Sequence, residues 1–222
     1  MRKKMALMIA LSIFAIFLSS VYSNILYARQ YAGIKIPFSF AIAGKNTKIY
    51  DFSNGAGIDK WAYRRQINQR PPSVNYLPSI EFNANQYNRI SADDGIRQSE
   101  VASIGYYASH RFVFSINESN ITSLHILWNG IGRNDWIFGG DGATLYIWNY
   151  TSGSYELWNT TTSATEVNLE ANISLGIGNY ISSDGNLTIL VAQNLPSFRF
   201  FFNFYSRLQT DYIKVDVTYI GG

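Results

Sequence analysis

The chain has 222 residues, of which 16% are aromatic, 15% are charged and none is cysteine, so disulfides, thiolate metal sites and cysteine nucleophiles are excluded. The formal charge is +3, but without the three basic residues at positions 2–4 the remaining 15 basic side chains balance 15 acidic ones. This neutrality argues against nucleic acid as a partner, because phosphate binding needs a concentrated positive surface. The aromatic-rich composition favours an all-β fold.

Residues 1–28 have the pattern of an export signal. Three basic residues precede an apolar run from Met5 to Leu18, and the small side chains of Val21 and Ser23 suit a cleavage site. We therefore expect a signal peptide over residues 1–23. The alternative is an uncleaved anchor extending to about residue 28, because the 24 residues from 5 to 28 carry no charge and could span a bilayer as a helix. Only in that case would the chain contact a membrane.

An arm over residues 24–44 follows, and it contains one strongly alternating segment. Its apolar face is formed by Ile34, Ile36, Phe38, Phe40 and Ile42. This period of two predicts a strand, and Pro37 places it at a sheet edge. The segment is either the first strand of the protein's own sandwich or a donor strand that completes the sheet of a neighbouring subunit.

The rest of the chain, residues 45–222, reads as one β domain. Short strands are expected at 47–52, 101–109, 111–116, 123–129, 167–173, 185–193, 197–205 and 211–219. A Gly-rich loop at 53–61, a Pro-containing crossover at 68–78, a polar turn at 91–95 and a Gly-rich loop at 130–142 separate them. The clearest element is a hairpin from Ala143 to Trp158, in which the sequence NYTSGS supplies the turn. We expect an antiparallel two-sheet β-sandwich or jelly roll.

Six segments together carry a family resemblance: YDFSNGAGIDKWAYR, QYNRISADDG, YYASHRFVFSI, ILWNGIG, LYIWNYTSGSYELW and TDYIKVDVTY. In this order they resemble jelly-roll domains of the galactose-binding-like type, which occur in archaeal and bacterial cell-surface proteins. The resemblance covers residues 50–222 and rests on strand cores and turn glycines. It implies a sandwich fold in a surface protein, and it carries no binding residue over to this chain.

The sequence contains six N-glycosylation acceptor sites, at Asn117, Asn120, Asn149, Asn159, Asn172 and Asn186. Several fall at expected turns, where a glycan is tolerated. Together with the export signal, they indicate an extracellular or cell-surface glycoprotein.

Acidic residues in two loops suggest a structural calcium ion, and no other cofactor is expected. Asp93 and Asp94 lie in the first loop, and Asp135 and Asp141 lie in the second. Their oxygens could bind calcium. The alternative is that these residues serve the backbone of the turns, since no EF-hand spacing is present.

Catalysis is not expected. The sequence has no GxSxG, HExxH or P-loop motif. Its two histidines, His110 and His125, read as surface or interface residues, and nothing in the spacing of Glu156, Glu166 and Glu170 demands a glycosidase carboxylate pair.

The sequence therefore favours a secreted or surface-tethered structural or adhesive protein, as a subunit of a filament or layer that self-associates or contacts other surface proteins. The alternative is a carbohydrate-binding module that contacts glycans through exposed aromatic rings. Most of the aromatic side chains must form the core. Trp136 is the best candidate for an exposed ring, because it lies in a Gly-rich loop.

Overall fold

The computed structural model describes residues 44–75 and 80–221. The expected signal segment and the alternating strand with its five apolar residues lie outside the described residues, so both remain predictions. Within the described part of the chain, no helix is both long and apolar enough to cross a membrane.

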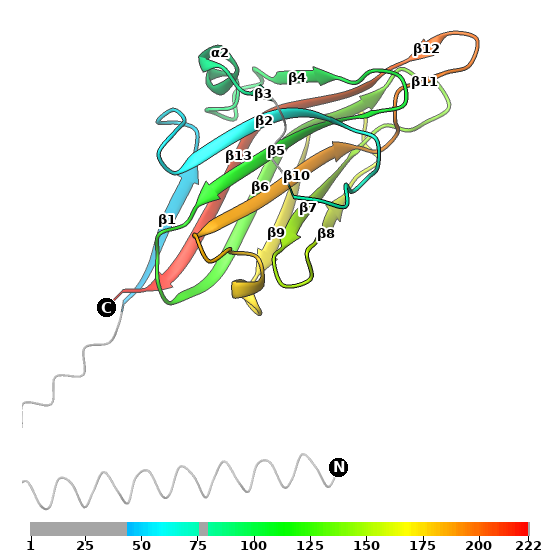
Figure 1. Ribbon diagram of the computed structural model, residues 1–222. Coiled ribbons are helices and arrows are strands. Elements are labelled where there is room, and N and C mark those ends of the chain that lie inside the picture. Colours follow the sequence, from blue (N-terminus) through cyan, green and yellow to red (C-terminus); the bar gives the residue numbers. More distant parts are fainter. Residues whose placement is uncertain (1–43, 76–79, 222) are drawn as a thin grey trace, which may run out of the picture. The chain divides into compact units, whose positions relative to one another are not determined.

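Two antiparallel sheets form the body of the molecule (Figure 1). The five-stranded sheet has the order β1 (Lys45–Asp51), β13 (Ser206–Ile220), β6 (Ile121–Asn134) and β9 (Val167–Ile173), with β4 (Gln98–Val101) also paired to β13. The six-stranded sheet has the order β3 (Ile80–Glu81), β2 (Lys60–Ile67), β5 (Tyr107–Ser115), β10 (Asn186–Gln193), β7 (Ala143–Asn149) and β8 (Ser154–Thr160). A small ribbon is made by β11 (Phe198–Arg199) and β12 (Asn203–Phe204). These sheets confirm the predicted antiparallel β fold.

The hydrophobic core lies between the two sheets. Strands β13 and β9 of the five-stranded sheet alternate between buried and more exposed side chains, whereas the central strands of the six-stranded sheet, β5, β10 and β7, are buried on both faces. Strand β13 buries Ile213, Val215 and Val217, while the residues between them are partly exposed. Opposite them, β5 contributes Phe112 and Phe114. Burial of such side chains is the main source of stability, at roughly 1.5–3 kcal/mol for each.

The β7–β8 hairpin, predicted for residues 143–158, is confirmed. Its strands pair from Thr144–Thr160 to Asn149–Ser154. The Asn149 side-chain oxygen accepts hydrogen bonds from the backbone N–H groups of Thr151 and Ser152, at 2.8 and 3.0 Å. Gly153 then adopts a φ of 63°, which closes the turn. The local sequence chemistry is therefore sufficient to specify this hairpin.

Strand β6 is longer than predicted. It continues through Gly130 and Gly132 to Asn134, so the Gly-rich segment 130–142 is a loop only from residue 135. A side chain at position 130 would overlap the Gln209 carbonyl oxygen and the Trp128 ring. Glycine at this position permits the close approach of β13 and Trp128, and it does not mark a turn.

Several other elements differ from the sequence prediction. Strands β2 and β4 were not expected, and the short helix α2 (Ala84–Asn88), whose first turn is capped by Asn83 and Gln86, was not predicted either. The single strand expected at 197–205 is instead the β11–β12 ribbon. Finally, a 3₁₀ turn, η1 (Ile177–Asn179), connects β9 to β10.

Strand β13 contains a bulge at Asp211. Its pairing with β6 shifts register between Thr210 and Tyr212. On the other edge of β13, β4 pairs only as far as Thr210, while β1 begins to pair at Lys214. Asp211 therefore lies in the gap between these two neighbours, and a bulge at such a point redirects a side chain.

Candidate functional site

The most exposed apolar surface in the described residues lies at the end of the sandwich opposite the C-terminus, where the β11–β12 ribbon projects (Figure 1). The ribbon meets the loop that follows β6. We call this surface the aromatic tip, and define it by Trp136, Ile137, Phe138, Phe198, Phe200, Phe201, Phe202 and Phe204.

Trp136 is the centre of the aromatic tip. Its ring makes edge-to-face contacts with Phe138 and Phe198, at centroid distances of 5.1 and 5.4 Å. Phe204 lies closer, at 4.7 Å, and Phe200 lies at 6.4 Å. These distances and the T-shaped geometry are those that aromatic pairs prefer. Trp136 is half-buried, and its neighbours hold the ring in place while one part of it stays accessible.

The outer side chains of the aromatic tip are in solvent. Ile137 is 83% exposed and Phe201 is 79% exposed, and Phe138, Phe200 and Phe202 are each more than half exposed. Single exposed apolar residues are ordinary in proteins, but a contiguous group of this kind marks a surface that contacts a ligand, a partner or a membrane. The tip is therefore the strongest candidate for a binding surface.

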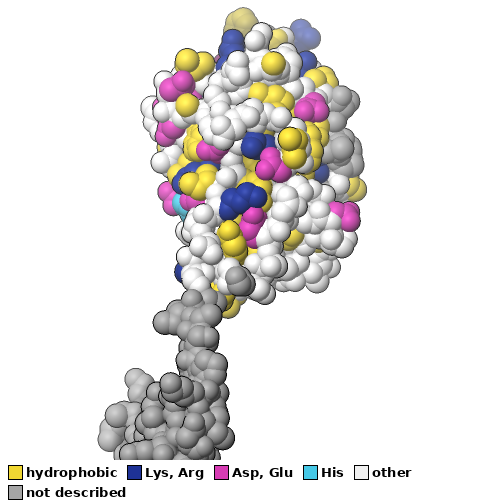
Figure 2. All heavy atoms as spheres, turned by 90° about the vertical axis from the view of Figure 1, so that its left-hand side faces the viewer, with side chains coloured by type: hydrophobic (Ala, Val, Ile, Leu, Met, Phe, Trp, Pro, Cys, Tyr) yellow, Lys and Arg dark blue, Asp and Glu magenta, His cyan; other side chains and the backbone are white. Residues whose placement is uncertain are grey.

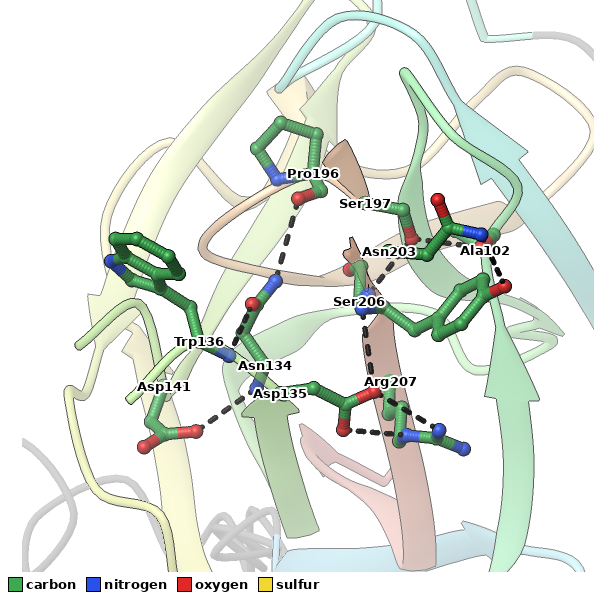
Figure 3. A network of polar contacts seen from close by, with 11 residues as sticks. Ala102, Asn134, Asp135, Trp136, Asp141, Pro196, Ser197, Asn203, Ser206 and Arg207 are labelled. Atoms are coloured by element: carbon green, nitrogen blue, oxygen red, sulfur yellow. Dashed lines mark hydrogen bonds and ion pairs between the residues drawn. The ribbon is translucent and has the colours of Figure 1, made fainter. Parts of the chain in front are cut away.

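A network around Asn134 fixes the loop that carries Trp136 (Figure 3). The Asn134 side-chain oxygen accepts a hydrogen bond from the Trp136 backbone N–H at 3.0 Å, and the Asn134 backbone N–H donates to Asp141 at 3.0 Å. The Asn134 side-chain amide donates to the Pro196 carbonyl oxygen at 3.4 Å. These bonds connect both ends of the loop to the segment that leads into the ribbon, so Trp136 is held in a defined position.

An ion pair flanks the aromatic tip. The Arg207 Nε and Nη2 atoms each donate to one oxygen of Asp135, at 3.2 Å, which is a bidentate arrangement. Hydrogen bonding to Arg207 holds the pKa of Asp135 below its usual value. Next to this pair, the Asn203 amide donates to the Tyr205 hydroxyl at 3.2 Å. The rim of the tip thus offers planar polar groups beside apolar rings.

A second aromatic surface, on the outer face of the six-stranded sheet, is covered. Tyr146, Trp148 and Tyr155 are all buried there. Part of the cover is the segment after β2, since the Asn75 side-chain oxygen accepts hydrogen bonds from Arg111 Nη2 at 2.6 Å and from the Tyr155 hydroxyl at 3.4 Å. These rings are therefore structural in the described conformation.

Two further tryptophans, Trp128 and Trp158, are also structural. Trp128 is fully buried and donates to the Thr210 hydroxyl at 2.9 Å. Trp158 packs against the core, with its ring edge-to-face on Tyr180 at 5.5 Å. Trp136, the exposed ring expected from the sequence, therefore stays the best binding candidate among these tryptophans.

The four aspartates predicted as calcium ligands do not meet at one point. Asp135 pairs with Arg207, Asp141 accepts from Asn134, and Asp94 accepts from the Ile96 backbone N–H at 2.9 Å. Each of these three therefore satisfies local backbone or side-chain groups, as turn aspartates commonly do. Asp93 instead lies beside Glu166 and Asp211.

The two histidines have different environments. His110 is fully buried, which corrects the expectation of a surface or interface residue; its Nδ1 lies 2.8 Å from the Thr210 hydroxyl and its ring packs edge-to-face on Phe82. His125 is partly exposed on the five-stranded sheet.

His125 lies between two carboxylates, with Nδ1 3.1 Å from Asp216 and Nε2 3.3 Å from Glu170. Glu156 accepts from Asn149 and Tyr180, and Glu166 pairs with Arg97. The three glutamates considered for catalysis are therefore bonded to three different sets of neighbours.

The six acceptor asparagines differ in accessibility. The exposed ones are Asn117, Asn120 and Asn172, and the half-buried ones are Asn159 and Asn186. Asn149 is buried, and its amide nitrogen donates to Glu156 at 2.8 Å. A glycan on Asn149 would have to replace this bond.

On the face of the molecule that Figure 2 shows, Lys and Arg side chains are interspersed with Asp and Glu, and no large patch carries charge of a single sign. Such a face lacks the positive surface that nucleic acid requires.

Comparison with known proteins identifies a family and a relative. Residues 57–219 match the AF_1625_C family, described as "Uncharacterized protein, C-terminal domain". An uncharacterized protein of Archaeoglobus fulgidus is 30% identical over 179 residues, which cover 80% of this chain and 26% of the relative. The chain therefore spans about a quarter of the length of the curated relative that it matches.

Solved structures of family 29 carbohydrate-binding modules are similar to this chain at a low level. One point mutant of the module CBM29-2 has a TM-score of 0.36 and 10% identity, covering 77% of this chain and 92% of the module. A different point mutant of CBM29-2, complexed with mannohexaose, has a TM-score of 0.36 and 9% identity, covering 78% of this chain and 92% of the module. Likeness at this level does not transfer a ligand to this chain.

Proposed function

The chain belongs to the AF_1625_C family, and we propose that it is a non-catalytic carbohydrate-binding module of a cell-surface protein. The aromatic tip is the observation that carries this proposal. The export signal and the exposed acceptor asparagines support the extracellular setting.

The chemistry of the aromatic tip suits a sugar. A pyranose ring has an apolar face of C–H groups and an edge of hydroxyl groups. The C–H face packs on an aromatic ring, whose π-face is electron-rich, and the hydroxyls bond to planar polar groups at the rim. Trp136 and the exposed phenylalanines supply the rings, and Asp135, Arg207 and Asn203 supply the polar groups.

The rigidity of the aromatic tip supports the same function. The Trp136 loop and the ribbon are held by the Asn134 network and by the Asp135–Arg207 pair before any ligand arrives. A preformed surface loses little conformational entropy on binding. The tip is also at the end of the molecule opposite the C-terminus, where a long polysaccharide can reach it (Figure 1).

The test is a glycan array probed with the full chain, followed by calorimetry with the best ligand. Phe201→Ala removes an exposed ring whose aromatic neighbour is Phe200, and it should lower the affinity at least tenfold, or about 1.4 kcal/mol. Leu175→Ala is the matched control, because Leu175 is 86% exposed and lies in the β9–η1 connection. An array without a binding glycan, or a Phe201→Ala variant that binds like the wild type, would contradict the proposal.

An adhesive or structural role is the second candidate, and the exposure of three consecutive phenylalanines at 200–202 favours it. Apolar contact with a second copy or with another surface protein would bury these rings. Sedimentation velocity of the full chain distinguishes the two roles: concentration-dependent association that Phe201→Ala abolishes supports adhesion, whereas a monomer that binds a glycan supports the module.

A further inference from the structure

Three carboxylates from distant parts of the sequence converge on one point beside the five-stranded sheet. They are Asp93 in the loop before β4, Glu166 immediately before β9, and Asp211 at the bulge of β13. One carboxylate oxygen of each lies within 4.8 Å of those of the other two. Like charges at this distance repel one another, and either a bound cation or protonation of one carboxyl relieves the repulsion.

The Asp211 carboxylate has one buried oxygen without a hydrogen-bond partner among the described residues. It is fully buried, and its Oδ2 accepts a hydrogen bond from the Gly95 backbone N–H at 2.8 Å. Its Oδ1 is also buried, and among the described residues it has no hydrogen-bond partner. A buried carboxylate oxygen without a partner costs at least about 1–3 kcal/mol, so such groups are found paired or bound to metal.

The backbone explains why this carboxylate is held in place. Because β13 bulges between Thr210 and Tyr212, Asp211 is an extra residue in the alternation, and the loop that contains Asp93 and Gly95 covers it. Bulges commonly redirect a side chain toward a functional site. Burial, opposed by the Gly95 N–H bond and reinforced by the nearby Glu166, raises the pKa of Asp211, as expected for a crowded carboxylate.

The charge of the group fits a divalent cation. Arg97 Nη2 lies 2.6 Å from Glu166 Oε2, so one of the three negative charges is already matched. The remaining charge is −2. A single ammonium group could not neutralise this charge, and Arg97 is already engaged with Glu166.

We propose that Asp93, Glu166 and Asp211 form a calcium-binding site that joins the 91–97 loop to strand β13 and to the start of β9. Three oxygens no more than 4.8 Å apart have a common centre at most about 2.8 Å from each, so an inward movement of a few tenths of an ångström brings all three to the calcium–oxygen distance of about 2.3–2.6 Å. Asp93 and Glu166 are exposed, so water can complete the six to eight ligands that calcium takes. Magnesium binds at about 2.0–2.1 Å in strict octahedral geometry and fits this spacing less well.

The experiment is calorimetric titration of the chelator-treated full chain with CaCl₂, together with thermal unfolding in CaCl₂ or EDTA. We expect one calcium ion to bind per chain, and the Tm to rise with calcium concentration, because a ligand of the folded state stabilises it. The same titration with MgCl₂ should give a weaker response. No binding heat and no change in Tm, or an equal response to MgCl₂, would overturn the proposal.

Variants distinguish calcium binding at these three carboxylates from non-specific binding to acidic side chains. Asp211→Asn and Glu166→Gln should each lower calcium affinity at least tenfold. Glu166 is exposed, so its variant tests the site even if Asp211→Asn does not fold. Asp94→Asn is the matched control in the same loop, since an asparagine oxygen can still accept from the Ile96 N–H, and it should bind calcium like the wild type. Wild-type affinity in Glu166→Gln would contradict the assignment.

Discussion

Replacing His110 with glutamine should remove much of the acid sensitivity of folding. His110 lies between the two sheets without exposure to solvent, near the Thr210 hydroxyl and against the edge of Phe82. Burial lowers the pKa of His110 to about 3 from the ordinary 6.5, because the core cannot solvate the imidazolium. Glutamine keeps a polar group near Thr210 and does not titrate in this range.

The sign and size of the effect follow from proton binding. As the pH falls through about 6.5 the unfolded chain protonates at this histidine, whereas the folded chain stays neutral until about pH 3. Acid therefore favours unfolding. The stability from a neutral His110 is complete above pH 6.5 and is lost progressively down to pH 3. At about 1.4 kcal/mol per pH unit the loss approaches 4–5 kcal/mol, a large share of the stability of a typical domain.

Urea denaturation at several pH values between 7 and 4, followed by tryptophan fluorescence, measures this effect. The free energy of unfolding of the wild type should fall more steeply with acid than that of His110→Gln. His125→Gln is the control, because it removes the only other histidine and should keep the steep fall. Parallel curves for the wild type and His110→Gln would refute the reasoning.

Three further predictions concern the fold and its modification. Gly130→Ala should destabilise by about 2–4 kcal/mol in thermal unfolding because its methyl group overlaps β13, whereas Gly178→Ala, with open space around it, should leave the Tm unchanged; equal Tm values for the two variants would be inconsistent with the packing at β6. Tyr87→Phe should cost about 1–2 kcal/mol in urea denaturation, since the buried hydroxyl bonds to the Ala62 backbone and to Glu81, and no loss would mean that these bonds are not formed. Glycopeptide mass spectrometry of native material should find Asn149 unmodified and exposed Asn172 preferred; a glycan on Asn149 in folded protein would contradict its burial.

The sequence predicts the elements whose chemistry is local. The hairpin at 143–158 and the alternating strand at 211–219 are recovered because turn residues and period-two burial specify them without reference to the rest of the chain. Strand β2 was not predicted because its sequence, KWAYRRQI, does not alternate between apolar and polar residues. Its two arginines are tolerated in the strand because their side chains are only half-buried. The prediction of one strand at 197–205 was wrong because Phe200, Phe201 and Phe202 are exposed, so the run of apolar residues does not correspond to a buried strand face.

The alternating apolar residues of strand β5 could have predicted that His110 is buried. Phe112 and Phe114 point into the core, and a residue two positions earlier on the same strand shares their face. The prediction of a surface histidine was wrong because it followed the usual preference of the residue type and not the period of the strand. For His125 the period of the strand and the prediction agree, since this histidine lies on the face opposite the buried Leu124 and Ile126.

The candidate sites were only partly predictable. Trp136 was identified from its Gly-rich loop, but three of its four ring partners come from the β11–β12 segment some 60 residues later. The pairing of β6 with β13 brings these two segments together. In the same way, Asp93 carries no local sign that it meets Asp211, because a one-residue bulge decides which side chain faces the loop. Long-range register is what single-sequence patterns lack.

The most direct test of carbohydrate binding at the aromatic tip is a ¹⁵N NMR titration of the full chain with its best array glycan. The chain has five tryptophans, and their indole N–H signals report on separate sites. Binding at the tip should shift the Trp136 indole signal and the backbone signals of residues 135–138 and 199–205, while the buried Trp128 and Trp148 signals stay in place. Shifts at Trp148 and Tyr155 with an unchanged Trp136 signal would contradict the account.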